Sequence, residues 1–250
     1  MAEIENRGGL LTGLFSRWKI VLLLVLWTLL CAISLSHSYT RLEQQLEYNL
    51  RTEGGTVFEL LVLMRRWNAE HNGVYVPLTE ASPSNPYLTD PQKDILSNRG
   101  QNLTKVNPAY MTRQLSEMAP TESPVQFRIL SLKPLNPINK PDQWEAESLL
   151  AFEQGALMKS TLEQRLEGTF FRYIAPLITT SECLKCHARQ GYQKGDVRGG
   201  LSIALRVNQR VAMVKSEKRE SAVLHGVIYL LVALLLILLG RTRNTEARRP

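Results

Sequence analysis

The sequence predicts an α+β domain held between two membrane-spanning helices. Two runs, residues 20–36 and 222–240, contain no Lys, Arg, Asp or Glu, and each is near the length of about 17 to 25 residues that a helix needs to cross hydrocarbon. Three runs between them, 125–132, 169–178 and 200–207, alternate in polarity or are rich in aromatic and branched residues. Such runs are typical of β-strands. Helical patterns lie around them, so the central segment combines helices with a sheet.

The two apolar runs divide the chain into five parts. Both ends are basic, and basic flanks stay in the cytoplasm, so we expect a cytoplasmic N-terminus at 1–19, a periplasmic domain at 37–221 and a cytoplasmic tail at 241–250. An alternative is that the first run is a cleaved secretory signal, because Arg17 and Lys19 precede it. The run is longer than the usual apolar stretch of a signal peptide, about 7 to 15 residues, which favours a retained anchor.

The surplus of positive charge does not predict a nucleic-acid-binding protein. The chain has 30 Lys and Arg against 23 Asp and Glu, a net charge of +7. The expected periplasmic domain carries 23 basic and 20 acidic residues, so more than half of the surplus lies in the short flanks of the spans. Basic flanks of this kind set membrane topology.

Helical patterns occupy four segments of the central region. Leu42, Leu46 and Leu50 recur every four residues and begin an amphipathic helix, which the pair Gly54-Gly55 could break. Asp142 is a suitable cap for another helix. The segment 73–91 is dense in Pro, Asn, Ser and Thr and predicts an irregular loop. We expect helices over 42–64, 109–118, 141–166 and 208–221.

The chemistry of the chain is concentrated in one pentapeptide, Cys183-Leu184-Lys185-Cys186-His187. A Cys-x-x-Cys-His segment is the attachment pattern of c-type haem. Two thiols at this spacing reach the two vinyl groups of one porphyrin, and the imidazole that follows lies beneath the iron. The pattern therefore predicts one covalently attached haem c.

Three other uses of the two thiols remain open. They are a structural disulfide, a thioredoxin-like redox pair and a zinc site. A disulfide between Cys183 and Cys186 closes a very small loop, and a redox pair is expected to open a helix in a βαβ unit. Zinc needs further ligands, whereas the one other thiol, Cys31, lies inside the first apolar run. The motif favours haem over all three.

Several long strings of the sequence resemble a known family. The family comprises c-type haem-binding, PAS-like periplasmic sensor domains, which are commonly carried between two membrane helices in bacterial histidine kinases and diguanylate cyclases. The resemblance extends over about residues 40–215. It implies a PAS-like antiparallel sheet flanked by helices, one covalent haem and the sensing of redox state or small gaseous ligands. The strings are RRWNAEHNGVYVP (65–77), KVNPAYMTRQLSE (105–117), SLKPLNPINKPDQWEAESLLAFEQG (131–155), FRYIAPLITTSECLKCHARQGYQKGD (171–196) and VRGGLSIAL (197–205).

Five residues are candidates for holding the haem. Cys183 and Cys186 would form the thioethers, and His187 would be the proximal iron ligand. His71 is the leading candidate for the distal ligand, because it lies in one of the shared strings and away from the membrane boundaries; Met64 is the alternative. Some relatives use a Cys there, but this chain has no further Cys outside the membrane.

These assignments leave two classes of function, neither of them enzymatic. The first is a redox or small-gas sensor in a bacterial inner membrane, for which a homodimer is one oligomeric state to consider. Its output is expected to come from a separate signalling protein, because only residues 241–250 follow the second span. The second is a membrane-tethered monohaem cytochrome that passes electrons to a redox partner. Both need the cytochrome c maturation machinery. The family resemblance favours the sensor.

Overall fold

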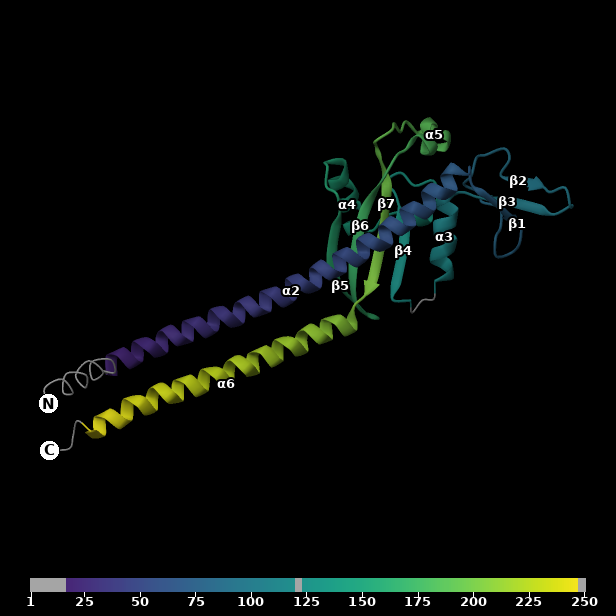
Figure 1. Ribbon diagram of the computed structural model, residues 1–250. Helices are drawn as coiled ribbons and strands as arrows, with labels where there is room; N and C mark the ends of the chain where they lie inside the picture. Colours follow the sequence, from purple (N-terminus) through teal and green to yellow (C-terminus); the bar gives the residue numbers. More distant parts are fainter. Residues whose placement is uncertain (1–16, 120–122, 247–250) are drawn as a thin grey trace. The chain divides into compact units, whose positions relative to one another are not determined.

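The computed structural model describes residues 17–119 and 123–246 (Figure 1). Contacts between residues divide the chain into two units. One unit contains both ends of the chain, Met1–Glu47 and Gln209–Pro250, and the other is Tyr48–Asn208. The second unit holds the sheets and the Cys-x-x-Cys-His motif.

The unit made of the chain ends is a pair of apolar helices. The helix α2 (Arg17–Glu70) contributes its residues up to Glu47, and α6 (Asn208–Glu246) contributes all but its first residue. Each contains a segment long and apolar enough to cross a membrane. Polar side chains also join the pair, for example Ser34 Oγ and His225 Nε2 at 3.0 Å. Both predicted spans are thus helical, and the pair is compatible with a two-span membrane protein.

Both long helices are continuous, which differs from the sequence prediction in one respect. α2 shows no break at Gly54-Gly55, although each Gly costs a helix about 1 kcal/mol relative to Ala. The reason is packing, because Gly54 lies directly against Tyr173 of the sheet. The predicted helix 208–221 is confirmed and runs on without interruption into the second apolar run as α6.

A four-stranded antiparallel sheet forms the centre of the Tyr48–Asn208 unit. Its strand order is β4-β7-β6-β5, and every neighbouring pair is antiparallel. The three strands predicted from the sequence are confirmed as β4, β6 and β7, so the α+β class is confirmed as well. The bounds are β4 Val125–Leu130, β5 Lys159–Arg165, β6 Gly168–Ile178 and β7 Val197–Arg206.

The fourth strand lies where the sequence predicted a helix. The helix α4 (Gln143–Glu153) begins at the predicted Asp142 cap, in a capping box with Glu145, but it ends well before residue 166. Gly155 follows with a φ of +96°, a left-handed conformation that Gly adopts without steric cost and that commonly ends helices. The chain then turns into β5, which pairs with β6.

A second, smaller sheet was not predicted. Its three antiparallel strands have the order β1-β3-β2, and β1 lies inside the segment 73–91 that the sequence indicated as loop. The strands have only three to five residues each, too few for a clear alternation. The remaining elements of this part of the chain are β1 Val74–Pro77, β2 Asp94–Leu96, β3 Asn102–Val106, α3 Pro108–Met118 and the short 3₁₀ turn η1 Pro137–Asn139.

The two faces of the four-stranded sheet pack differently. Successive residues of a strand point to opposite faces, and one face presents a row of buried apolar side chains to α2. The rings of Phe58 in α2 and Tyr173 in β6 lie 6.3 Å apart. On the other face, α4 covers one end of the sheet, where Leu149 and Phe152 form a core cluster with Leu130 and Ile174. Beyond this cluster, that face carries polar residues and the buried ring of Phe170.

The contact between Gly54 and Tyr173 leads to a matched pair of predictions. A Cβ at position 54 would lie 2.8 Å from the Cβ and Cγ atoms of Tyr173, whereas a Cβ at position 55 meets only the Tyr173 hydroxyl, at 3.7 Å. We expect Gly54→Ala to lower the free energy of unfolding by about 1 to 3 kcal/mol through overpacking. Gly55→Ala should leave it unchanged or raise it by up to about 1 kcal/mol. Urea denaturation followed by circular dichroism distinguishes the two, and equal stabilities would contradict the close packing.

Candidate functional site

The Cys-x-x-Cys-His motif lies on a short helix that follows the strand β6. The helix is α5 (Ser181–His187), and its first turn includes a hydrogen bond from Cys183 N to Thr180 O at 3.1 Å. The Thr180 hydroxyl donates to the carboxylate of Glu182 at 2.7 Å, which holds the pKa of that carboxyl below its ordinary value. Cys183 and His187 are four residues apart, a spacing that brings side chains to the same face of a helix.

The first thiol of the motif is available for reaction. Cys183 is half-buried and forms no disulfide, and its Sγ lies 3.4 Å from the Thr180 hydroxyl. The backbone of Cys186 belongs to α5, while its side chain lies outside the described part of the structure. The disulfide alternative is therefore not realised at Cys183.

The imidazole of His187 is oriented by an amide. Its Nδ1 lies 2.7 Å from Oε1 of Gln190, which stands in the short 3₁₀ turn η2 (Ala188–Gln190). Arg198 Nη2 donates to the same Oε1 at 3.3 Å, and because a guanidinium can only donate, this atom acts as an acceptor. Nδ1 of His187 therefore carries the proton, and the lone pair of the neutral ring is on Nε2.

The surroundings of His187 favour the neutral ring. Burial lowers the pKa of His187 most, the positive charges of Arg198 and Arg65 lower it further, and the hydrogen bond with Gln190 acts in the opposite direction. Neutral imidazole is the form that binds metal ions. The site thus presents an Nε2 lone pair on the helix that also carries the two Cys residues.

Two arginines give the site permanent positive charge. Arg65 of α2 donates from Nη1 to Pro108 O at 3.0 Å and to Thr112 Oγ1 at 2.9 Å. Burial lowers the pKa of Arg65 to about 10, although its interaction with Cys183 raises that pKa, so the group stays charged at neutral pH. Arg198 of β7 donates to Ser131 Oγ at 3.0 Å. Such groups suit the carboxylates of a bound cofactor.

A side-chain hydrogen bond ties α5 to the end of α2. Lys185 Nζ donates to Asn72 Oδ1 at 2.6 Å, and the two residues are 113 positions apart. Asn72 has a φ of +56°, a left-handed conformation that Asn tolerates better than most residues. This turn immediately follows His71, so the structure places the predicted distal candidate beside the residue that holds the motif helix.

The two distal candidates differ in their surroundings. His71 is exposed; its Nδ1 lies 2.7 Å from Trp67 O and its ring 4.4 Å from the Trp67 ring. A carbonyl only accepts, so Nδ1 carries a proton, and in the neutral form of the ring the lone pair is on Nε2. Met64 lies in α2 and is half-buried. His71 is the candidate whose donor atom is oriented by hydrogen bonding.

The side chains present fit a covalent haem better than the alternatives. Among the side chains that the structure describes, which do not include that of Cys186, no group of three or more Cys, His, Asp and Glu is arranged to hold a metal ion. Cys183 and Cys186 lie on a helix that follows a strand, as in a thioredoxin-like redox pair, and the sequence had not indicated this helix. The strands on either side of the helix, β6 and β7, are antiparallel, however, whereas those of a βαβ unit are parallel. A thioether-forming thiol and a single oriented imidazole are what a c-type haem requires.

Sequence reasoning did not find Gln190 and Arg198. Both lie inside strings that the sequence shares with the family, but no short motif gives either residue a role. Gln190 is one of many polar residues near His187, and Arg198 comes from β7 after a turn. The positioning of a metal-binding imidazole by its other nitrogen is general. That rule indicates that a partner is needed without indicating which residue supplies it.

Comparisons with known proteins identify the family. The model of the Tll0287-like family matches residues 37–206, more than half of the chain. A solved structure described as the crystal structure of the cyanobacterial heme-protein Tll0287 aligns with 62% of this chain and 93% of that one, at 16% identity and a TM-score of 0.39. No curated protein matches the chain. On the match to the family model, the chain belongs to the Tll0287-like family.

Proposed function

We propose that this chain is a membrane-anchored periplasmic haem c protein that senses redox state or a small gaseous ligand. Cys183 and Cys186 form the two thioethers, and His187 is the proximal iron ligand. The observation that carries the proposal is the oriented imidazole of His187, whose Nδ1–H is bound to Gln190 one turn after a half-buried free thiol. A bound haem supplies an iron centre that changes its redox state or exchanges a ligand.

Family membership supports the cofactor. The Tll0287-like family shares its name with a protein described as a cyanobacterial heme-protein. The specific prediction for this chain, covalent attachment, rests on its own Cys-x-x-Cys-His segment. The positive charges of Arg65 and Arg198 near that segment suit the two propionates of a haem.

The proposed distal ligand is His71. Its position beside Asn72, which binds α5 through Lys185, supports this assignment. We expect His71→Ala to change the resting optical spectrum of the haem protein, because a six-coordinate iron would lose one ligand. Met64→Leu is the matched variant. A spectral change in Met64→Leu and none in His71→Ala would transfer the distal role to Met64.

The sensor proposal includes an output through a separate protein. A change of iron ligand would alter the packing around α5, and two continuous helices, α2 and α6, connect this unit with the apolar segments. Rigid helices are suitable elements for such a two-state transition. The proposed partner that receives the signal is a membrane or cytoplasmic signalling protein. The proposed sensor domain is PAS-like and lies in the periplasm. The chain itself is proposed to perform no catalysis.

Carbon monoxide and nitric oxide test the proposal. The full chain is produced in a bacterium with the cytochrome c maturation machinery, and the reduced protein is titrated with each gas while its absorption spectrum is recorded. We expect stable adducts, because a sensor iron needs a replaceable ligand. An iron that stays six-coordinate under both gases and only exchanges electrons would instead indicate a tethered electron carrier.

The contact of His187 with Gln190 predicts a shift in reduction potential. In Gln190→Glu, a carboxylate accepts the Nδ1–H bond more strongly and makes the imidazole a better electron donor, which stabilises ferric iron. We expect the midpoint potential to fall by on the order of tens of millivolts, where 59 mV is a factor of ten for one electron.

Gln193→Glu is the control for this substitution. It adds the same charge three residues along the chain, at an exposed position. Spectroelectrochemical titration of both variants separates the two effects. Equal shifts in the two variants would mean that charge alone, without the hydrogen bond to His187, sets the potential.

A further inference from the structure

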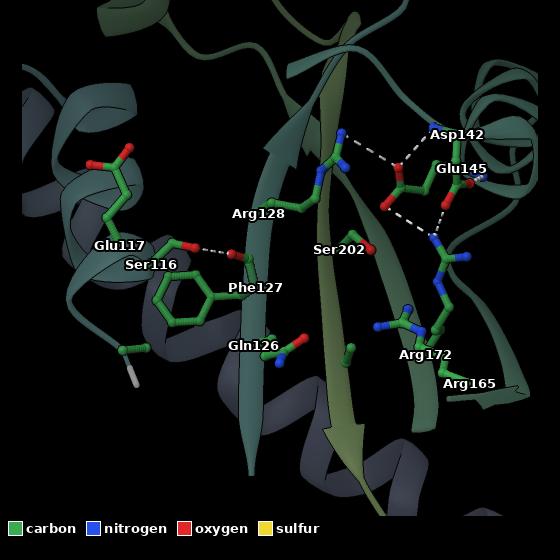
Figure 2. Close-up of a pocket in the computed structure, with 12 residues that line it drawn as sticks. Ser116, Glu117, Gln126, Phe127, Arg128, Asp142, Glu145, Arg165, Arg172 and Ser202 are labelled. Carbon is green, nitrogen blue, oxygen red and sulfur yellow. Dashed lines mark hydrogen bonds and ion pairs between the residues drawn. The ribbon is translucent and has the colours of Figure 1, made fainter. Parts of the chain in front are cut away.

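The sheet face that α4 only partly covers contains a pocket of about 470 Å³ (Figure 2). It belongs to the Tyr48–Asn208 unit and lies on the opposite face of the sheet from Tyr173 and α2. Its floor consists of small residues of β7, Ser202 and Ala204, and its walls come from α3, β4, β5, β6 and the start of α4. Small-molecule sites typically have volumes of about 300 to 1,000 Å³. The pocket is therefore large enough for a small organic ligand.

Strand register explains why polar residues gather there. Ala204 of β7 pairs with Gln126 of β4 on one side and with Arg172 of β6 on the other, so these side chains share one face. Arg128 pairs with Ser202 one step along. Because the floor residues are short, the long side chains of the neighbouring strands surround an open space instead of filling it.

The carboxylates of the pocket are already engaged. Asp142 Oδ1 accepts from Glu145 N and its Oδ2 accepts from Arg172. Glu145, which is 2% exposed, accepts from Asp142 N through Oε2 and lies 3.1 Å from Arg172 Nη2 through Oε1. These acids neutralise Arg172 and fix its place, as the dashed lines in Figure 2 show. They therefore have little capacity left to bind a cation.

Two further guanidinium groups retain donors. Arg128 uses Nη2 both for its hydrogen bond to Lys140 O and for its 3.7 Å ion pair with Glu145. Arg165 directs Nε and Nη2 to one oxygen of Glu163, at 3.1 and 2.8 Å. A guanidinium has five N–H donors and no acceptor, so the pocket wall has more donors than the described acceptors use. An additional carboxylate is the ligand group that matches this excess.

We propose that this pocket binds a small organic carboxylate, with Arg128, which pairs with Ser202 of the floor, as the group that recognises it. The formal charges of the lining residues cancel, with Arg128, Arg165 and Arg172 against Glu117, Asp142 and Glu145. A ligand with a single negative charge is thus favoured over a polyanion. The hydroxyl of Ser202 on the floor suits a ligand that also carries a hydroxyl or keto group. The protein then has a second input besides the proposed haem.

Titration calorimetry on the full haem-loaded chain tests the proposal. The probes are the carboxylates lactate and propionate. Two controls accompany them: lactamide, the uncharged analogue of lactate, and sodium chloride at the same ionic strength as the carboxylate solutions. We expect lactate to bind with a dissociation constant below about 1 mM, which corresponds to about −4 kcal/mol, and lactamide to bind at least tenfold more weakly. No heat with either carboxylate, or equal binding of lactamide or chloride, overturns the proposal.

Two variants locate the binding. Arg128→Gln removes the recognising charge, and Ala204→Leu fills the floor without changing charge; each should weaken lactate binding at least tenfold. Arg99→Gln, at an exposed loop position outside the pocket, should bind like the parent protein. If both pocket variants keep their affinity while their circular dichroism is unchanged, the ligand binds elsewhere and the assignment is wrong. Haem content, measured separately, reports on the cofactor proposal independently.

Discussion

We expect the replacement of Cys183 and Cys186 together with Ala to abolish the haem stain of the proposed haem c protein after denaturing electrophoresis. Haem c stays on the chain during denaturation because two thioether bonds join it to the protein. A haem that is held only by an iron–imidazole bond is released. His187 is retained in this variant, so any haem that still binds does so reversibly and is lost in detergent. The expected effect is complete, from full staining of the parent to none in the double variant.

Cys31→Ala is the matched control for the double substitution. It also removes a thiol, but Cys31 lies in the first apolar segment, far from the motif in the sequence, and we expect its staining to equal that of the parent. Mass spectrometry of each product checks the result through the mass added by one haem. An unstained parent protein, made with the maturation machinery present, would refute covalent attachment altogether.

Removal of the Glu145 carboxylate is expected to have the largest effect on stability. Glu145 and Arg172 are 2% and 7% exposed, and Glu145 both completes the capping box of α4 and pairs with Arg172 at 3.1 Å. In Glu145→Ala, the buried guanidinium of Arg172 keeps its ion pair with Asp142 but loses the Glu145 carboxylate, which is its most deeply buried partner. Breaking a buried ion pair from one side costs about 3 to 5 kcal/mol, and the cap adds about 1 kcal/mol.

Glu147→Ala on the same helix provides the comparison. Glu147 is exposed and accepts a hydrogen bond from Gln143 one turn earlier, so its removal should change the free energy of unfolding by less than about 0.5 kcal/mol. Urea denaturation of the two variants, with the same detergent and haem content, measures the difference. Similar midpoints for Glu145→Ala and Glu147→Ala would show that the Arg172 network does not stabilise the fold.

The strands show how far local pattern predicts this fold. The runs at 125–132, 169–178 and 200–207 formed strands because their alternation or apolar content matches a half-buried sheet. The strand β5 was missed because its sequence, KSTLEQR, contains Leu, Glu, Gln and Arg, which are good helix formers. It is a strand because it lies at the edge of the sheet, where pairing with β6 outweighs its local preference.

The sequence by itself determined the two apolar helices and the residues that can attach a haem, because a span and a Cys-x-x-Cys-His segment are each complete within a short stretch of chain. Only the tertiary structure decided which nitrogen of His187 carries the proton, and that His71 lies beside the residue that holds α5. It also decided that three arginines surround one pocket. These features depend on contacts between residues far apart in sequence, such as Lys185 with Asn72, and such contacts form only when burial of the common core brings distant segments together.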